Sequence, residues 1–165
     1  MATSLIYAMT VSGSEVLSGN SPAVAADAQK TVTHTGYNTG ATLTSGGSVP
    51  LTNVLYFLKA MSAGAATIDL TSLLGTNDQA VDLSGKKIQV AKFENPSTNA
   101  NNITVTFGAS NGYLLAGAAW KAILAPGQAV MFFGNDAAPD VGGSAKTIDI
   151  SGTGSQALKV SLGAG

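Results

Sequence analysis

Hydrophobic and polar positions alternate with a period of two over much of this 165-residue chain. The clearest case is residues 103–107, in which Ile103, Val105 and Phe107 alternate with Thr104 and Thr106. The same spacing recurs over residues 5–11, 30–35, 120–124, 148–150 and 158–162. Since successive side chains of a strand point to opposite faces, the pattern predicts half-buried antiparallel strands.

Two further segments, 87–94 and 128–133, are apolar on both faces, which is typical of strands that lie centrally in a sheet or face a neighbouring subunit. Residues 53–61 fit helical spacing and strand spacing equally well. We favour a strand there because Val, Tyr and Phe suit a pleated surface and a turn-like segment follows. Only residues 69–75 and 21–29 favour a turn or two of helix.

Turn residues separate these segments at short intervals, and Pro126 followed by Gly127 predicts a type II turn. Residues 152–156 are interpreted as a hairpin turn. The fold class predicted is all-β: an antiparallel β-sandwich or jelly roll of about eight to ten short strands with very little helix. We expect one domain over residues 1–165, with residues 1–30 forming an extended arm or the first strand.

Charged residues make up only 10% of the chain, against about 25% in a typical domain, while 45% of residues are hydrophobic. Such a surface favours contact with other protein, although Ala and Gly also raise the hydrophobic count. A net charge of −1 and basic residues that are all lysine argue against nucleic acid as a partner. No apolar stretch predicts a membrane span or a signal peptide.

Residues suited to catalysis are scarce and scattered. His34 is the only histidine, lies among threonines, and is interpreted as a polar residue of an edge strand rather than a catalytic base. Two carboxylates could act as a glycosidase pair, but spacing in the sequence does not select one. The candidates are Glu15, Asp27, Asp69, Asp78, Asp82, Glu94, Asp136, Asp140 and Asp149. Asp69 and Asp149 are expected to point outward, opposite a lysine or water.

Binding motifs are equally weak. The pairs Asp78/Asp82 and Asp136/Asp140 lie in loops that offer oxygen ligands, without the dense spacing of a dedicated calcium loop. Three aromatic residues, Tyr37, Tyr113 and Trp120, could form a sugar-stacking platform, although its strand position predicts that Trp120 is core. The chain has no cysteine. We therefore predict no catalytic, cofactor-binding or metal-binding residue, and no enzyme.

Residues 67–136 and 145–165 are rich in Ala, Thr, Gly and Asn and have short turn spacing. In this pattern the chain resembles the small β-sandwich structural proteins of tailed bacteriophage virions, namely capsid decoration, cement and minor head proteins. The resemblance implies a non-enzymatic role in a virion assembled in the host cytoplasm. The implied partners are other copies of the chain, as a trimer or another symmetric oligomer, and a major capsid protein or other virion protein. The alternative is a carbohydrate- or receptor-binding module of a fibre or tail tip.

Overall fold

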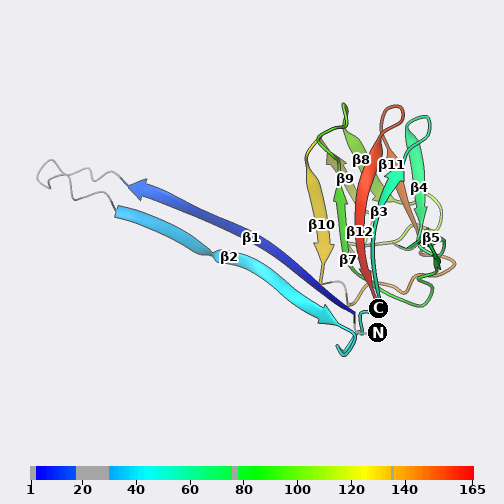
Figure 1. Cartoon of the computed structure of the whole chain (residues 1–165), viewed down its shortest axis with the longest axis horizontal. Helices are drawn as coiled ribbons and strands as arrows, with labels where there is room; N and C mark the ends of the chain where they lie inside the picture. The colour runs from blue at the N-terminus through cyan, green and yellow to red at the C-terminus, as the bar shows by residue number, and fades with distance from the viewer. Residues whose placement is uncertain (1–2, 18–29, 76–77, 135) are drawn as a thin grey trace, which may run out of the picture. The chain divides into compact units, whose positions relative to one another are not determined.

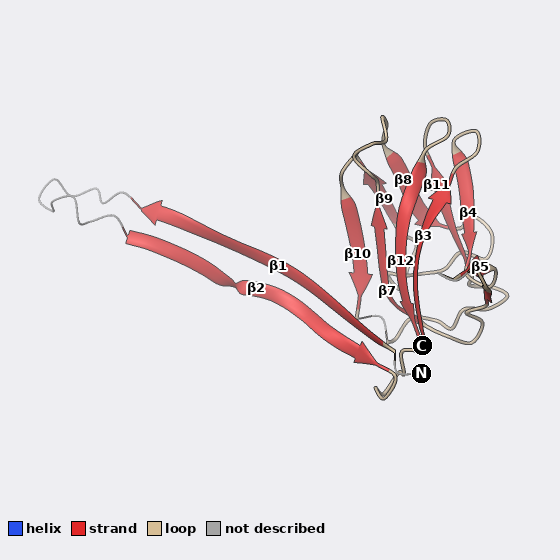
Figure 2. Cartoon of the chain, in the orientation of Figure 1, coloured by secondary structure: helices blue, strands red, loops and turns tan. Residues whose placement is uncertain are grey.

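The computed structural model describes residues 3–17, 30–75, 78–134 and 136–165, with side-chain environments omitted for residues 13, 15–17 and 30–38. The described residues form strands and no helix (Figures 1 and 2). The strands are β1 (Ser4–Leu17), β2 (Lys30–Thr44), β3 (Asn53–Ala60), β4 (Ala65–Asp69), β5 (Leu73–Leu74), β6 (Ala80–Val81), β7 (Ile88–Glu94), β8 (Ile103–Phe107), β9 (Lys121–Leu124), β10 (Ala129–Phe133), β11 (Thr147–Ser151) and β12 (Ala157–Ala164).

The chain divides into two units. Residues 6–42 form one unit, which consists of the long two-stranded sheet β1–β2. Residues 1–5 and 43–165 form the other unit, which holds the remaining strands. Of the stretch 1–30, for which we predicted an arm or a first strand, residues 4–17 form β1.

Two four-stranded antiparallel sheets build the larger unit. Their strand orders are β10-β7-β12-β3, here called the first sheet, and β4-β11-β8-β9, the second sheet. In the first sheet Val160 of β12 lies between Phe93 of β7 and Phe57 of β3. In the second sheet Ile150 of β11 lies between Val105 and Ala66. Each row of apolar partners faces the core that the two sheets share.

Aromatic rings join the two sheets. Phe93 of β7 stacks on Trp120, the residue before β9, with ring centroids 5.9 Å apart. The ring centroid of Phe132, in β10, lies 4.9 Å from that of the same indole. These rings come from opposite sheets, and aromatic pairs add about 0.5–1.5 kcal/mol to the energy of burial. They therefore fix how the sheets stack at the β10–β9 side.

Tyr113, in the segment between β8 and β9, fills part of the core. Its side chain is fully buried. Its hydroxyl donates to the carbonyl of Pro139 at 2.7 Å and accepts from the backbone N–H of Ile88 at 3.0 Å. Burial raises the pKa of this hydroxyl. Both polar neighbours are thereby satisfied inside an apolar layer, as buried polar groups require.

Asn95 organises the uncharged loop that precedes β8. It is fully buried, and its side-chain amide donates to the carbonyls of Leu124 at 2.8 Å and Asn101 at 3.1 Å. Its side-chain oxygen accepts from the amide of Asn99 at 2.7 Å. Asn95 also binds the Pro126–Gly127 turn through the N–H of Gly127 at 2.7 Å. The loop is thus held by neutral hydrogen bonds instead of ion pairs.

The predicted fold class is confirmed: the chain is all-β with antiparallel sheets, and residues 53–60 are a strand. The described residues form twelve strands rather than eight to ten, and β1 and β2 are 14 and 15 residues long rather than short. The jelly-roll connectivity is not established by these strand orders. Gly127 has a φ of 84° and Gln128 N–H donates to the carbonyl of Ala125, as a type II turn requires.

Two local predictions were wrong. Residues 69–75 form a turn and β5 instead of helix, because the Asp69 carboxylate captures the N–H and hydroxyl of Thr71. Residues 152–156 are not a hairpin turn, since they link β11 of the second sheet to β12 of the first. The other expected helical stretch, 21–29, lies outside the described residues.

Replacing the buried hydroxyl tests this account of the core. Tyr113→Phe leaves the N–H of Ile88 and the carbonyl of Pro139 without their partner in a buried site. We expect the free energy of unfolding in urea to fall by about 1–3 kcal/mol. The control is Tyr56→Phe, because the Tyr56 side chain is exposed and should change stability little. Equal effects of the two variants would contradict the assigned role.

Candidate functional site

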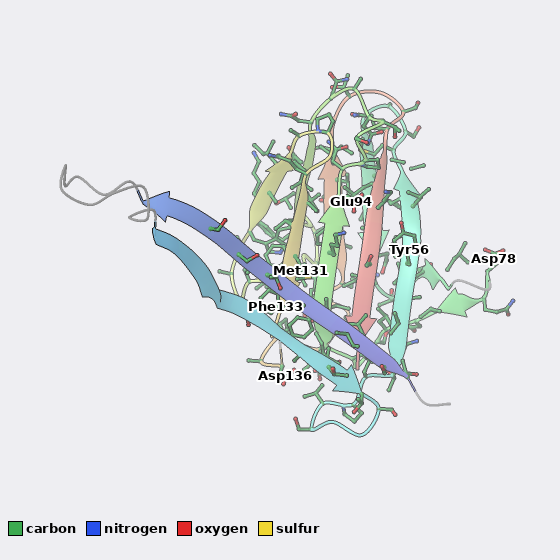
Figure 3. All side chains as sticks on the ribbon, turned by 60° about the vertical axis from the view of Figure 1, so that its left-hand side comes forward. Tyr56, Asp78, Glu94, Met131, Phe133 and Asp136 are labelled. Carbon is green, nitrogen blue, oxygen red and sulfur yellow. The ribbon has the colours of Figure 1, made fainter. Side chains whose placement is uncertain are left out.

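The outer side of the first sheet carries a row of exposed apolar side chains on its edge strand β3. Val54, Tyr56 and Leu58 are 41%, 56% and 63% exposed, whereas Leu55, between two of them, is buried against the core. Register places Tyr56 beside Ser161 and Leu58 beside Lys159 of β12 on this same side. We call Val54, Tyr56 and Leu58 the β3 stripe. Figure 3 shows Tyr56 on β3 and Glu94 on the neighbouring part of the sheet.

The outer side of the second sheet has a different character. Thr67, Thr104 and Thr106 lie there, and Thr67 donates its hydroxyl to Asp149 at 2.7 Å. Asp149 also accepts from the N–H of Ala109 at 2.8 Å. The predicted alternation of threonine with apolar residues in β8 is therefore confirmed, with Ile103 and Val105 buried. Of the two outer sides, the first sheet's is the one with neighbouring exposed apolar side chains.

On the outer side of the first sheet one glutamate pairs with two lysines. Glu94 of β7 accepts from Lys92 and from Lys159, each at 2.9 Å. Hydrogen bonds from Lys159 and then Lys92 hold the pKa of the Glu94 carboxyl below its usual range. The same carboxylate raises the pKa of Lys159. This three-residue network joins β7 to β12 across the outer side of the sheet.

The end of this outer side near Gly163 is closed by the chain itself. Gly163 of β12 is buried, and a Cβ on it would lie 3.2 Å from Cδ2 of Leu5. Thr3 is held close by through the hydrogen bond from Ser45 N–H to its carbonyl at 3.1 Å. Because Gly163 has no side chain, the side chain of Leu5 can pack there. Leu5 is the last residue of the N-terminal stretch that belongs to the larger unit.

A groove of about 510 Å³ runs beside β3. One wall is β3 from Tyr56 to Lys59, and the other includes residues 72–75 and Asp78 of the β5–β6 hairpin. Leu74 on this second wall is 62% exposed. Ile68 and Asp69 of β4 also line the groove.

The carboxylates of this groove have structural roles in the described chain. Asp69 accepts from Thr71 N–H at 2.9 Å, from Thr71 Oγ1 at 2.6 Å and from Lys146 Nζ at 3.0 Å. These partners, the Thr71 hydroxyl foremost, lower the pKa of Asp69, so its carboxylate is ionised at neutral pH and accepts these hydrogen bonds. Asp69 and Asp149 were expected to lie opposite a lysine or water. Asp69 does pair with Lys146, whereas Asp149 accepts hydrogen bonds from Thr67 and from the N–H of Ala109. Asp78 occupies the left-handed region with a φ of 57° in the turn between β5 and β6.

The other candidate residues from the sequence lie apart. Asp82 accepts from Ser84 in a local turn, and Asp140 pairs with Lys87 at 3.0 Å. Among the described residues no three His, Cys, Asp or Glu side chains gather closely enough to hold a metal ion. The side chains of Glu15, His34 and Tyr37, and all of Asp27, lie outside the described part of the structure.

Trp120 is buried in the core, as its strand position predicts, and Tyr113 is buried as well, so neither ring forms an exposed stacking platform. Among the side chains that the structure describes, the large exposed aromatic is Tyr56, for which the sequence predicted only a position in a strand. Val54 and Leu58 lie two residues before and after Tyr56, so all three side chains point to the same side of β3. This spacing of apolar residues can be seen in the sequence. The described residues contain no helix long and apolar enough to cross a bilayer.

Glu94→Gln tests the ion network by its pH dependence. Because the folded-state pKa of Glu94 lies below its unfolded value, its contribution is present above the unfolded pKa and is lost as pH falls through the folded pKa. The difference in Tm between the wild type and the variant should therefore shrink between about pH 6 and about pH 3. Added salt at neutral pH should also reduce it. A difference that is constant or grows on acidification would contradict the network's role.

Comparison of the chain with protein-family models, with curated protein sequences and with solved structures gave no match. Function is therefore inferred from the chain's own surface, its charges and its unpaired strand edge.

Proposed function

We propose that this protein is a non-enzymatic structural component of a virion, a capsid decoration, cement or minor head protein that stabilises a phage particle through subunit contacts. The observation that carries the proposal is the β3 stripe: three adjacent large apolar side chains exposed on an edge strand. Contiguous apolar surface of this kind marks sites of protein contact. Its partners are other copies of the chain and a major capsid or other virion protein.

The electrostatics of the surface support this role. Three of the four charged side chains on the strands of the first sheet, Lys92, Glu94 and Lys159, are joined in one ion network, and the fourth is Lys59 of β3. The second sheet presents threonine hydroxyls that are neutral. Burying neutral or mutually paired groups costs less desolvation free energy than burying unpaired charges. Such a surface suits repeated subunit contacts.

The hairpin β1–β2 supports the same role from a different part of the chain. Ile6, Met9 and Val11 of β1 are exposed large apolar side chains. A two-stranded sheet is at best marginally stable alone in water and normally needs a partner surface. Both units of the chain therefore carry apolar surface that a neighbouring subunit would cover.

Receptor or carbohydrate binding is the second candidate, and the exposed ring of Tyr56 favours it. Its neighbours on β3 are the aliphatic Val54 and Leu58, whereas sugar sites combine aromatic rings with several polar groups. A glycan array in which binding is lost on Tyr56→Ala would favour this candidate over assembly.

Light scattering coupled to size-exclusion chromatography tests the assembly proposal. The full-length protein should elute as an oligomer whose mass is a multiple of the 16.4 kDa chain. The double variant Val54→Ser/Leu58→Ser should shift it toward smaller species, because it removes apolar area from the contact. The control is Ile123→Ser on β9, whose side chain is similarly exposed at 57%.

Both variants should keep the wild-type Tm closely, since exposed positions contribute little to stability. A protein that stays monomeric at every concentration and fails to bind phage capsids would overturn the proposal. If Ile123→Ser dissociates the oligomer as strongly as the double variant does, the protein still assembles, but the β3 stripe is not the specific contact.

A further inference from the structure

The open edge of β3 is the longest strand edge of the two sheets. β3 has eight residues and ends its sheet, whereas the other terminal strands, β10, β4 and β9, have five, five and four. It contains no proline, and its register with β12 runs from Asn53 to Ala60 without a bulge. Proline, bulges and several charges are the usual devices that block pairing at an edge. β3 carries only one charged residue, Lys59.

The backbone of β3 offers hydrogen-bonding groups on its open side. Met61 N–H donates to the carbonyl of Gln156 at 2.8 Å, and these two residues are opposite one another when the β3–β12 register is continued. Hydrogen-bonded positions alternate along an antiparallel pair, so the odd-numbered residues of β3 bind β12. The N–H and C=O groups of Val54, Tyr56 and Leu58 therefore point away from β12, toward the open edge.

The groove beside this edge has room for a strand and apolar contacts for its side chains. Tyr56 and Leu58 line one wall, and the exposed Leu74 lines the other. Figure 3 shows Asp78, in the turn of the β5–β6 hairpin, projecting beyond the edge of β3. We expect a thin two-stranded ribbon to fit at this edge more easily than a second complete sandwich, which would have to pass this hairpin.

The β1–β2 hairpin of another copy has the properties of such a ribbon. It is one sheet thick, and its strands are 14 and 15 residues long, enough to span β3. Residues 3–14 contain no charged side chain, so their burial in the groove leaves no unpaired ion. Ile6 lies on one face of β1 and Met9 on the other, and both are exposed. A ribbon with apolar side chains on both faces needs cover on both.

We propose that the β1–β2 hairpin of one copy adds as a strand ribbon to the open edge of β3 in a second copy. Main-chain hydrogen bonds to Val54, Tyr56 and Leu58 provide the pairing, and the groove receives the apolar side chains of β1. The two surfaces in contact are different, so the contact is heterologous and repeats into a closed ring or a chain of subunits. This inference rests on the proposed function, for which it names the partner and the surface.

Cross-linking between two variants, each with one introduced cysteine, tests the pairing. Because the chain has no native cysteine, only the introduced thiols can react. Variants with cysteine at Ile6, Met9 or Val11 are each mixed with Leu58→Cys and treated with a short bis-maleimide, which tolerates an unknown register. At least one mixture should give a covalent heterodimer. The matched control replaces Leu58→Cys with Ile123→Cys, an equally exposed position on the second sheet that should not react with β1.

Leu58→Pro gives a second test that isolates the backbone. Proline removes an N–H that faces the open edge and none that binds β12, so the sheet should remain folded by circular dichroism. Association should be lost or weakened at least tenfold, while Leu58→Ala should weaken it less because the N–H remains. Equal effects of proline and alanine would mean that no strand pairs with β3.

Other outcomes separate this inference from the proposed function. A double variant Met9→Cys/Leu58→Cys that cross-links only within a monomer shows that the hairpin covers its own sandwich. Tyr56→Cys copies that cross-link to one another show pairing of β3 with β3. Either result, or an oligomer with no cross-link from β1 to β3, overturns the inference and leaves the assembly role intact. A strictly monomeric protein without affinity for capsids removes both.

Discussion

Apolar contact between the two four-stranded sheets is the interaction on which the rest of the sandwich depends. Phe93, Trp120 and Phe132 meet at one side of the core, and Tyr113 fills part of it with its hydroxyl fully paired. The chain has no cysteine, so disulfides do not contribute to its stability. The outer sides of the sheets, the groove and the loops are all positioned by how these rings pack, because strand register and sheet stacking follow from them.

Hydrogen bonds between neutral polar groups hold several loops of this protein in place. From a buried position and without a charge, Asn95 binds two loop residues, Asn99 and Asn101, and Leu124 at the end of β9. Residues 67–70 (TIDL) and 147–150 (TIDI) have similar sequences, and β4 and β11 pair there as antiparallel neighbours, with Ile68 facing Ile148 and Thr67 bound to Asp149. Neutral hydrogen bonds thus hold the buried loop residues, and few charged residues in the whole chain lower the desolvation cost of covering its surface with protein.

The outer sides of the two sheets differ, and in the proposed assembly this difference would decide which side meets a neighbouring copy. One carries threonine, and the other carries the β3 stripe, an ion network and a glycine that admits Leu5. An apolar edge strand exposed in this way promotes aggregation unless a particular partner covers it. The β1–β2 ribbon of another copy could cover this edge, and each copy would supply one ribbon for one edge. Repetition of the contact would then build a ring or a lattice rather than a single dimer.

Periodicity in the sequence determined the all-β class, most strand positions and the burial of Trp120, because period-two burial is a local property of each strand. It could not determine that β5 replaces a helical turn, since the Asp69–Thr71 and Asp69–Lys146 bonds form only in the fold. Nor could it place β3 at an edge or bury Tyr113 instead of exposing it. Strand order depends on contacts between residues far apart in the chain, such as Val160 with Phe57, and those contacts exist only once the sheets have assembled.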